Sequence, residues 1–337
     1  MPPATDSSRP HRRLTAWLSM LLRVGVTVGL MSWAITGGGG KDGQGPDWNR
    51  FLQLLARAEW PWWLAALAVS LAGQVVAGIR WAALARPLGF DFPNRFFVRR
   101  FFEGMFFSLC LPSSIGGDVV KAVRVGSSTR LRLLAGCSVL ADRLTGLAAL
   151  GVLVGTAVVG KNKALGTAGI VTVFVGLLVA VMAGFWLGLA LLDRIHGLLP
   201  QGSRTREFVG RLLPYRQRPS LVIAAVGWSF VVQLAGVAAV VLVARAIGVV
   251  QPALVWLTVV PLVALAMVLP ISIGGFGIRE NAIEYLLRGY GVSSEEGVAI
   301  GLLWGVCTVL TGLVGGVLFL LERRPAVPAD PSASVAA

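Results

Sequence analysis

Histidine and cysteine are scarce in this sequence, which has two of the first and three of the second in 337 residues. His11 and His196 fall in polar flanks, and the chain has neither a His-Glu-x-x-His nor a Gly-x-Ser-x-Gly pattern, so nothing supports metal or serine hydrolase chemistry. Cys110, Cys137 and Cys307 lie in or beside apolar runs without paired spacing. We expect packing residues rather than disulfide or metal ligands, and we predict no cofactor.

Charged residues are also few, at 14% of the chain against 55% hydrophobic residues, and the mean hydropathy is +0.76. A soluble domain of this length carries more charge, so the composition predicts an all-α polytopic membrane protein. Acidic residues are the scarcer kind, with 16 against 30 basic ones and a net charge of +14. The basic residues lie in the connections between apolar runs, which favours a membrane surface over nucleic acid as their counter-charge.

One stretch of the chain, residues 111–121, is repeated at residues 269–279. Leu, Pro, Ser, Ile and two adjacent glycines recur in the same order, and both copies end on a basic side chain, Lys121 and Arg279. A helix stop, a flexible doublet and a charge thus recur as one unit. This favours an internal duplication, the alternative being two unrelated glycine-containing turns.

Long apolar runs predict six transmembrane helices, at residues 14–36, 62–84, 133–160, 165–192, 221–244 and 297–321. The first run is too long for the apolar region of a cleaved signal peptide, so we expect it to be retained. A polar tail, 1–13, precedes the membrane domain at 14–321. A Pro, Ala and Ser tail at 322–337 is expected to be disordered.

Each copy of the repeated motif is predicted to lie in a re-entrant hairpin. The arm at 101–111 is shorter than the ~20 residues of a spanning helix, and it contains Glu103. Pro112 ends this arm and acts as a hinge. Asp118 is then expected to cap a second short helix that returns the chain to the same side.

The second hairpin is predicted from an arm at 253–269, a hinge at Pro270 and a short charged helix at 279–290. If the N-terminus is cytoplasmic, most of the 30 basic residues fall on the inner side, which is the positive-inside pattern. Both termini are then cytoplasmic. The halves at about 62–160 and 221–321 form an inverted repeat, a common plan of secondary transporters, which hold substrate between the halves.

Ionisable residues inside apolar spans are costly and are functional candidates by default. Asp142 and Arg143 are adjacent in the third span, and because neighbours on a helix point in different directions we expect them to have different partners. The alternative is a purely structural ion pair between helices. Arg80 lies near a helix end, where its side chain can instead extend to the interface.

Charged residues of the two hairpins leave more than one interpretation open. Lys121 and Arg124 are three residues apart on one short helix. They could bind a phosphodiester together, or they could serve only as signals of membrane topology. Asp118 as a helix cap would repel an anion there, which favours the second hairpin as the anion cradle. Glu280 and Glu284 are one turn apart; they could be a proton-coupling pair, but we expect them to be solvated charges.

These motifs are similar to those of a known family. The shared features are Pro112 with Gly116-Gly117-Asp118 and Lys121, the Asp142-Arg143 pair with Gly146, and residues 270–280. Over about residues 62–321 the chain resembles the membrane domain of lysylphosphatidylglycerol synthases, also called flippase-like. The resemblance implies flipping of lipid, with aminoacyl transfer left to a soluble domain that is absent here. Lys121 stands where many relatives have Arg, which alters head-group geometry because Lys lacks the bidentate fork.

The leading hypothesis is therefore a translocator that moves a phospholipid or a lipid-linked anionic head group between leaflets. The alternatives are a membrane component of an aminoacyl- or glycosyl-lipid transferase, and a non-transporting scaffold for a separately encoded synthase. A membrane lipid is the expected partner, with a separate transferase possible, no nucleic acid, and the oligomeric state open. Candidate residues for the head group or its path are Arg80, Glu103, Ser114, Gly116, Gly117, Asp118, Lys121, Arg124, Asp142, Arg143, Ser272, Gly274, Gly275, Arg279 and Glu280.

Overall fold

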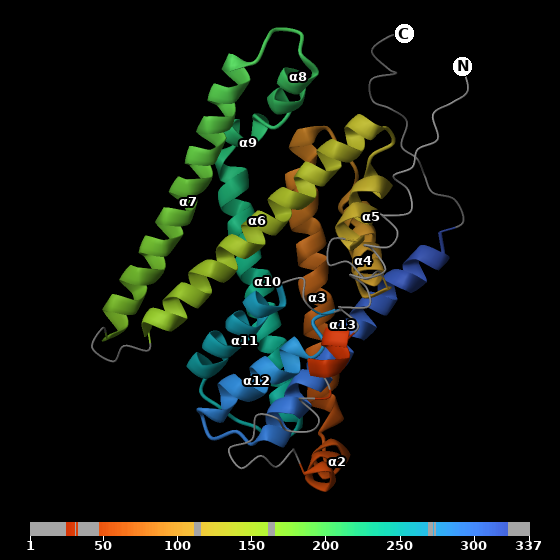
Figure 1. Ribbon diagram of the computed structural model, residues 1–337, viewed down its shortest axis with the longest axis vertical. Helices are drawn as coiled ribbons and strands as arrows, with labels where there is room; N and C mark the ends of the chain where they lie inside the picture. Colours follow the sequence, from red (N-terminus) through yellow and green to blue (C-terminus); the bar gives the residue numbers. More distant parts are fainter. Residues whose placement is uncertain are drawn as a thin grey trace.

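The computed structural model describes residues 25–30, 32, 47–110, 116–160, 166–268, 272 and 274–322. These residues form helices and short connections without a β-strand, which confirms the predicted all-α class (Figure 1). The helices are α2 (Trp48–Ala56), α3 (Trp60–Ala85), the 3-10 turn η1 (Arg86–Leu88), α4 (Asn94–Cys110), α5 (Gly116–Val125), α6 (Thr129–Gly160), α7 (Gly166–Leu198), α8 (Arg204–Gly210), α9 (Pro214–Gln217), α10 (Pro219–Ala246), α11 (Ala253–Val268), α12 (Ile278–Arg288) and α13 (Ser294–Leu320).

Five helices of the described part are long and apolar enough to cross a membrane, namely α3, α6, α7, α10 and α13. They correspond to the second to sixth predicted spans. Their starts follow local chemistry, because a proline stands in the first turn of α3 and of α10. At α13 the Ser293 hydroxyl accepts from the backbone N–H of Glu296, whose carboxylate accepts from that of Ser293. The predicted span at 14–36 falls mostly outside the described residues, and 25–30 are helical.

Two helical hairpins, α4 with α5 and α11 with α12, stand where the repeated motifs predict them (Figure 1). The bounds of the second hairpin agree with the prediction. The first arm was predicted too short, because α4 begins at Asn94 instead of at residue 101 and so includes Arg95, Arg99 and Arg100. The last two of these arginines are stabilised on the helix by ion pairs with carboxylates. The hinges Pro112 and Pro270 lie outside the described residues.

The two arms of the first hairpin touch through their backbones at Gly104 and Gly117. A Cβ atom on Gly117 would lie 2.1 Å from the Gly104 carbonyl oxygen and 2.1 Å from the Ser108 hydroxyl oxygen. No side chain fits at that distance. The glycine doublet of the motif therefore sets how closely α4 and α5 can pack.

The end of α4 in the first hairpin meets the turn before α12 in the second hairpin. A Cβ atom on Gly274, in the turn before α12, would lie 3.5 Å from a methyl group of Leu109, at the end of α4. The same side chain also packs against α13 at Gly312. The end of α4, just before the first copy of the repeated motif, is thus brought against the second copy, although the two are far apart in the chain.

The helix contacts of the first half, α3 to α6, have counterparts in the second half, α10 to α13. Helix α4 packs on α3, α5 and α13, and its counterpart α11 packs on α10, α12 and α6. Likewise α5 packs on α6 as α12 packs on α13, while α3 and α10 pack on each other. Exchanging the two halves therefore leaves the list of packed helix pairs unchanged.

Helix α7 lies at one side of the molecule, where it packs against α6 (Figure 1). None of the residues in its most apolar stretch is buried, whereas about a third of the corresponding stretch of α10 is. Two apolar cores are packed elsewhere, one around Trp81 and Phe97 and the other around Trp256 and Ile300. The charged residues considered below lie in or beside these two cores.

Candidate functional site

A buried ion pair joins two spans of the first half, and its arginine also bonds to a span of the second half. The guanidinium of Arg80 on α3 donates from Nε to Asp142 Oδ1 on α6 at 2.7 Å and from Nη1 to Ser229 Oγ on α10 at 2.8 Å. The Arg80 and Asp142 side chains are each 7% exposed. The interpretation that Arg80 extends to the interface is therefore wrong, because its partner lies inside the bundle.

Arg143, the neighbour of Asp142, points elsewhere and pairs with Asp118 on α5. This confirms the prediction that adjacent residues on α6 have different partners. The other oxygen of Asp118 accepts from Lys121 Nζ at 3.4 Å. We call Asp118, Lys121 and Arg143 the Asp118 cluster. Asp118 was predicted to cap α5, but that helix begins at Gly116, and the Asp118 carboxylate is engaged by two cations instead.

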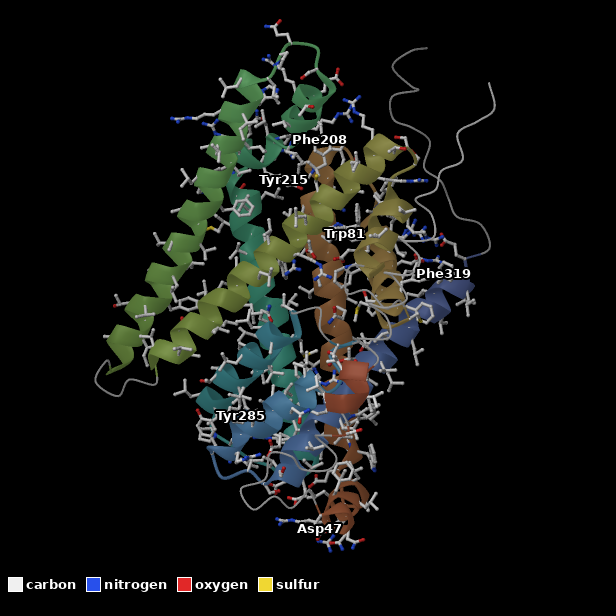
Figure 2. The ribbon with its side chains drawn as sticks, viewed as in Figure 1. Asp47, Trp81, Phe208, Tyr215, Tyr285 and Phe319 are labelled. Atoms are coloured by element: carbon white, nitrogen blue, oxygen red, sulfur yellow. The ribbon has the colours of Figure 1, made fainter. Side chains whose placement is uncertain are left out.

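Lys121 is enclosed by aromatic rings as well as by charge. Its Nζ atom lies 3.9 Å from the ring centre of Phe101 and 5.9 Å from that of Trp81, which Figure 2 labels on α3. Such rings stabilise an ammonium through their negative faces. The Arg143 side chain, in contrast, is 49% exposed. The Asp118 cluster thus runs from a buried cation to an exposed one.

A second group of charges lies between α4, α5 and the end of α13. We call it the Glu103 cluster, and it consists of Arg99, Arg100, Glu103, Arg124 and Glu322. Glu103 is fully buried. Lys121 and Arg124 were interpreted either as joint partners of one phosphodiester or as topology signals, and the structure places them in different clusters.

A third charged site lies at the start of the second hairpin's return helix. Arg279 on α12 is fully buried and donates from Nε to the Gly301 carbonyl oxygen at 3.0 Å and from Nη2 to Glu280 Oε1 at 2.8 Å. Its guanidinium carbon lies 4.8 Å from the ring centre of Phe276 and 5.7 Å from that of Trp304. Arg279 Nη1 has no hydrogen-bond partner within the described part of the chain.

The turn before α12 contains two left-handed glycines close to this arginine. Gly274 and Gly275 have φ of 60° and 78°, a conformation that side chains disfavour. Nearby, the buried hydroxyl of Ser272 also lacks a partner among the residues described. Unsatisfied buried donors of this kind are uncommon and point to a missing partner. Ser114, the counterpart predicted in the first hairpin, lies outside the described residues.

Glu280 and Glu284 are not the solvated charges that the sequence favoured. Both are buried, at 0% and 6% exposed. Glu280 accepts from the Gly277 backbone N–H at 2.6 Å as well as from Arg279, and Glu284 accepts from Arg288 and from Ser294. Helix α13 covers both because its glycines allow α12 to approach closely.

Two residues of these sites were missed by sequence reasoning. Glu322 follows the last span directly and was assigned to the disordered tail, and Ser229 is one hydroxyl within an apolar run. Neither stands out by type or spacing, since each gains its role from a helix far away in sequence. The only signal in the sequence was that Glu322, an acidic residue, directly follows an apolar span.

A cavity of about 750 Å³ lies away from all three sites, between the start of α6 and α8. Thr129, Arg130 and Phe208 line it, and Figure 2 labels Phe208. Arg130 pairs there with Glu207 at 2.5 Å, and both side chains are about half exposed. Its charges are thus balanced, and neither hairpin reaches it, so we do not place the head group there.

Comparison with known proteins identifies the family of this chain. No curated protein and no solved structure matches this chain. The family described as lysylphosphatidylglycerol synthase TM region matches residues 20–316. That range includes every described helix from α2 to α12 and nearly all of α13. The chain is therefore a multi-pass membrane protein that belongs to the lysylphosphatidylglycerol synthase transmembrane-region family.

Proposed function

We propose that this protein translocates an anionic phospholipid, or a lipid-linked anionic head group, between the two leaflets without chemical change. The observation that carries the proposal is the meeting of the two helical hairpins at Leu109 and Gly274, with buried cations beside both. A polar group at membrane depth needs protein or water partners throughout. Cations along the hairpins would supply them in stages.

The two ends of this path differ in chemistry. Arg143 and Lys121 of the Asp118 cluster present one exposed and one buried cation. In the second hairpin, Arg279 has an N–H group without a hydrogen-bond partner among the described residues, next to the turn formed by Gly274 and Gly275. Backbone N–H groups in such turns and guanidinium groups both suit a phosphate. The head group would pass from the first set of donors to the second.

We further propose that the two halves form an inverted repeat. Their exchangeable helix contacts support it, and so does Figure 1, in which α4 and α5 lie in the upper part of the view and α11 and α12 in the lower part. In transporters of this plan the halves rock against each other around a fixed site. Such motion would open the path to each leaflet in turn.

The topology has a direct test with single cysteines in a variant lacking Cys110, Cys137 and Cys307. Asn49 on α2 and Thr205 on α8 are exposed, and these two helices lie at opposite ends of the view in Figure 1. An impermeant maleimide should label Asn49→Cys in intact cells, and Thr205→Cys only after permeabilisation, because basic connections stay inside. Labelling of both from the same side would contradict the inverted arrangement.

The translocation itself is tested with purified protein in vesicles that contain a fluorescent phosphatidylglycerol. We expect the protein to speed the loss of fluorescence to dithionite, and Arg143→Gln to slow it about tenfold or more, as loss of a charged hydrogen bond of ~1.5–3 kcal/mol implies. Removing this half-exposed cation leaves the buried pair of Arg80 and Asp142 intact.

Arg130→Gln is the matched control. Arg130 is also on α6, is also paired with one carboxylate, and is 47% exposed against 49% for Arg143. It should leave the rate unchanged. If Arg130→Gln slows translocation as much as Arg143→Gln does, the slowing is caused by the loss of any surface cation and is not specific to Arg143. If folded wild-type protein moves no anionic lipid, with or without a proton gradient, a scaffold for a separate synthase becomes the better account.

A further inference from the structure

We infer that Arg99, Arg100 and Arg124 form a phosphate-binding site, and that the Glu322 carboxylate occupies it in this structure. The site lies between α4, α5 and the end of α13, and it shares no residue with the Asp118 cluster or with the Arg279 site. It rests on the proposed function in one respect only, which is that a lipid is named as the source of the phosphate.

The geometry is that of an anion cradle. Arg100 donates from Nη1 to Glu322 Oε2 and from Nη2 to Oε1, both at 2.7 Å, which is the bidentate arrangement by which arginine binds carboxylates and phosphates. Arg124 donates to the same Oε2 atom, and an Arg99 nitrogen lies 3.7 Å from it. Three guanidinium groups from two helices thus converge on one carboxylate.

The charge balance leaves room for an anion in place of Glu322. The Glu103 cluster holds three arginines and two glutamates, and Glu103 is fixed at its base by Arg99, Arg100 and Arg124. If Glu322 leaves, three cations face one acid. A phosphodiester carries one negative charge and would restore the net charge that the cluster has with Glu322 in place.

The surroundings also suit a phosphate better than a second protein carboxylate. Arg100 is 2% exposed, and its Nε atom has no hydrogen-bond partner within the described residues, so the Glu322 carboxylate does not satisfy the whole guanidinium. A phosphate offers more acceptor oxygens than a carboxylate does. The rings of Phe96 and Phe319 lie 5.0 and 5.1 Å from the guanidinium carbons of Arg100 and Arg124. Figure 2 labels Phe319 near the end of α13.

Glu322 is placed so that it can leave without unfolding a helix. It follows the last residue of α13, Leu320, by two positions. Hydrogen bonds from Arg100 hold the pKa of Glu322 below its ordinary value, against the opposing effect of its partial burial. The carboxylate is therefore ionised at neutral pH. Protonation would release Glu322 only at a pH below the ordinary pKa of a glutamate. At neutral pH, a competing anion is therefore needed to displace it.

The test measures binding of dioctanoyl phosphatidylglycerol to the full chain in an uncharged detergent by thermophoresis. Glu322→Gln removes the competing charge and should raise the affinity about tenfold, the scale of a single charge-assisted hydrogen bond. Adding Arg124→Gln to that variant should abolish the gain. Arg124 is 20% exposed, so its loss is tolerated better than that of the buried Arg100.

Glu207→Gln is the matched control, because it also frees one arginine from a carboxylate, at an exposed pair. It should leave the affinity unchanged. An affinity that Glu322→Gln does not raise, or a gain that survives Arg124→Gln, would overturn the site. Glu322→Gln should raise the affinity for dioctanoyl phosphatidylcholine by less, because the choline of this lipid cancels the phosphate charge.

Inorganic phosphate separates the two sources of the anion. If Glu322→Gln raises the affinity for inorganic phosphate but not for either lipid, the lipid assignment is overturned in favour of a soluble phosphate. Binding at this site does not require movement of lipid. A binding gain in a protein that fails to translocate would therefore count against the proposed function and leave the phosphate site standing.

Discussion

Replacing Asp142 with Asn should destabilise the protein by about 3–5 kcal/mol, because Arg80 then remains charged and without its counter-ion inside the bundle. Both side chains are 7% exposed, and Ser229 is the only other hydrogen-bond partner of the Arg80 side chain within the described residues. Thermal unfolding of the purified protein in detergent, followed by circular dichroism, measures the loss. We expect a large fall in melting temperature.

The double variant Arg80→Gln with Asp142→Asn separates stability from function. Two neutral amides can bond to each other, so most of the melting temperature should return, while translocation stays slow if the charges serve the path. Asp193→Asn is the control, since its ion pair with Arg216 is 41–46% exposed and contributes about 0–1 kcal/mol. Equal losses of melting temperature for Asp142→Asn and Asp193→Asn would contradict the claim that the buried pair contributes more to stability than an exposed one.

Gly117→Ala should disrupt the first hairpin, because the new methyl group would overlap the Gly104 carbonyl and the Ser108 hydroxyl at 2.1 Å. Helix α5 must then move away from α4, at a cost of about 1–3 kcal/mol for overpacking. Separation of the arms would also displace Lys121, which packs on Gly104. Both the melting temperature and the translocation rate should fall.

Gly136→Ala on α6 is the corresponding control, since nothing lies within 4 Å of a Cβ atom there. Alanine is favoured over glycine inside a helix by up to about 1 kcal/mol, so this variant should be as stable as the wild type or more stable. A tolerated Gly117→Ala would mean that α4 and α5 are not held at this close approach.

Sequence reasoning located the helices and the hairpins because these depend on local properties. The length of an apolar run predicts a span, and Pro112 followed by two glycines predicts a break. The start of α4 was misplaced because Arg99 and Arg100 are polar, and polar residues near an apolar arm suggest a connection. Their helical position depends on Glu103 and on Glu322, which lies far along the chain.

The partners of the charged residues were harder to predict than their importance. Asp142 and Arg143 were singled out, but nothing in the sequence names Arg80 and Asp118 as their partners. The burial of Glu280 and Glu284 depends on how closely α13 passes, which glycines on that helix decide. Contacts between distant helices are set by the packing of the whole bundle, and a single sequence does not display them.

The contact between Leu109 and Gly274 also has an electrical consequence under the proposed function. If water reaches both hairpins from opposite leaflets, the insulating layer between the two compartments is little thicker than one leucine side chain. The membrane voltage would then fall across that short stretch, at about 2.3 kcal/mol per elementary charge for every 100 mV. An anionic head group would sense nearly all of it in the single step past Leu109, so the voltage would favour movement in one direction.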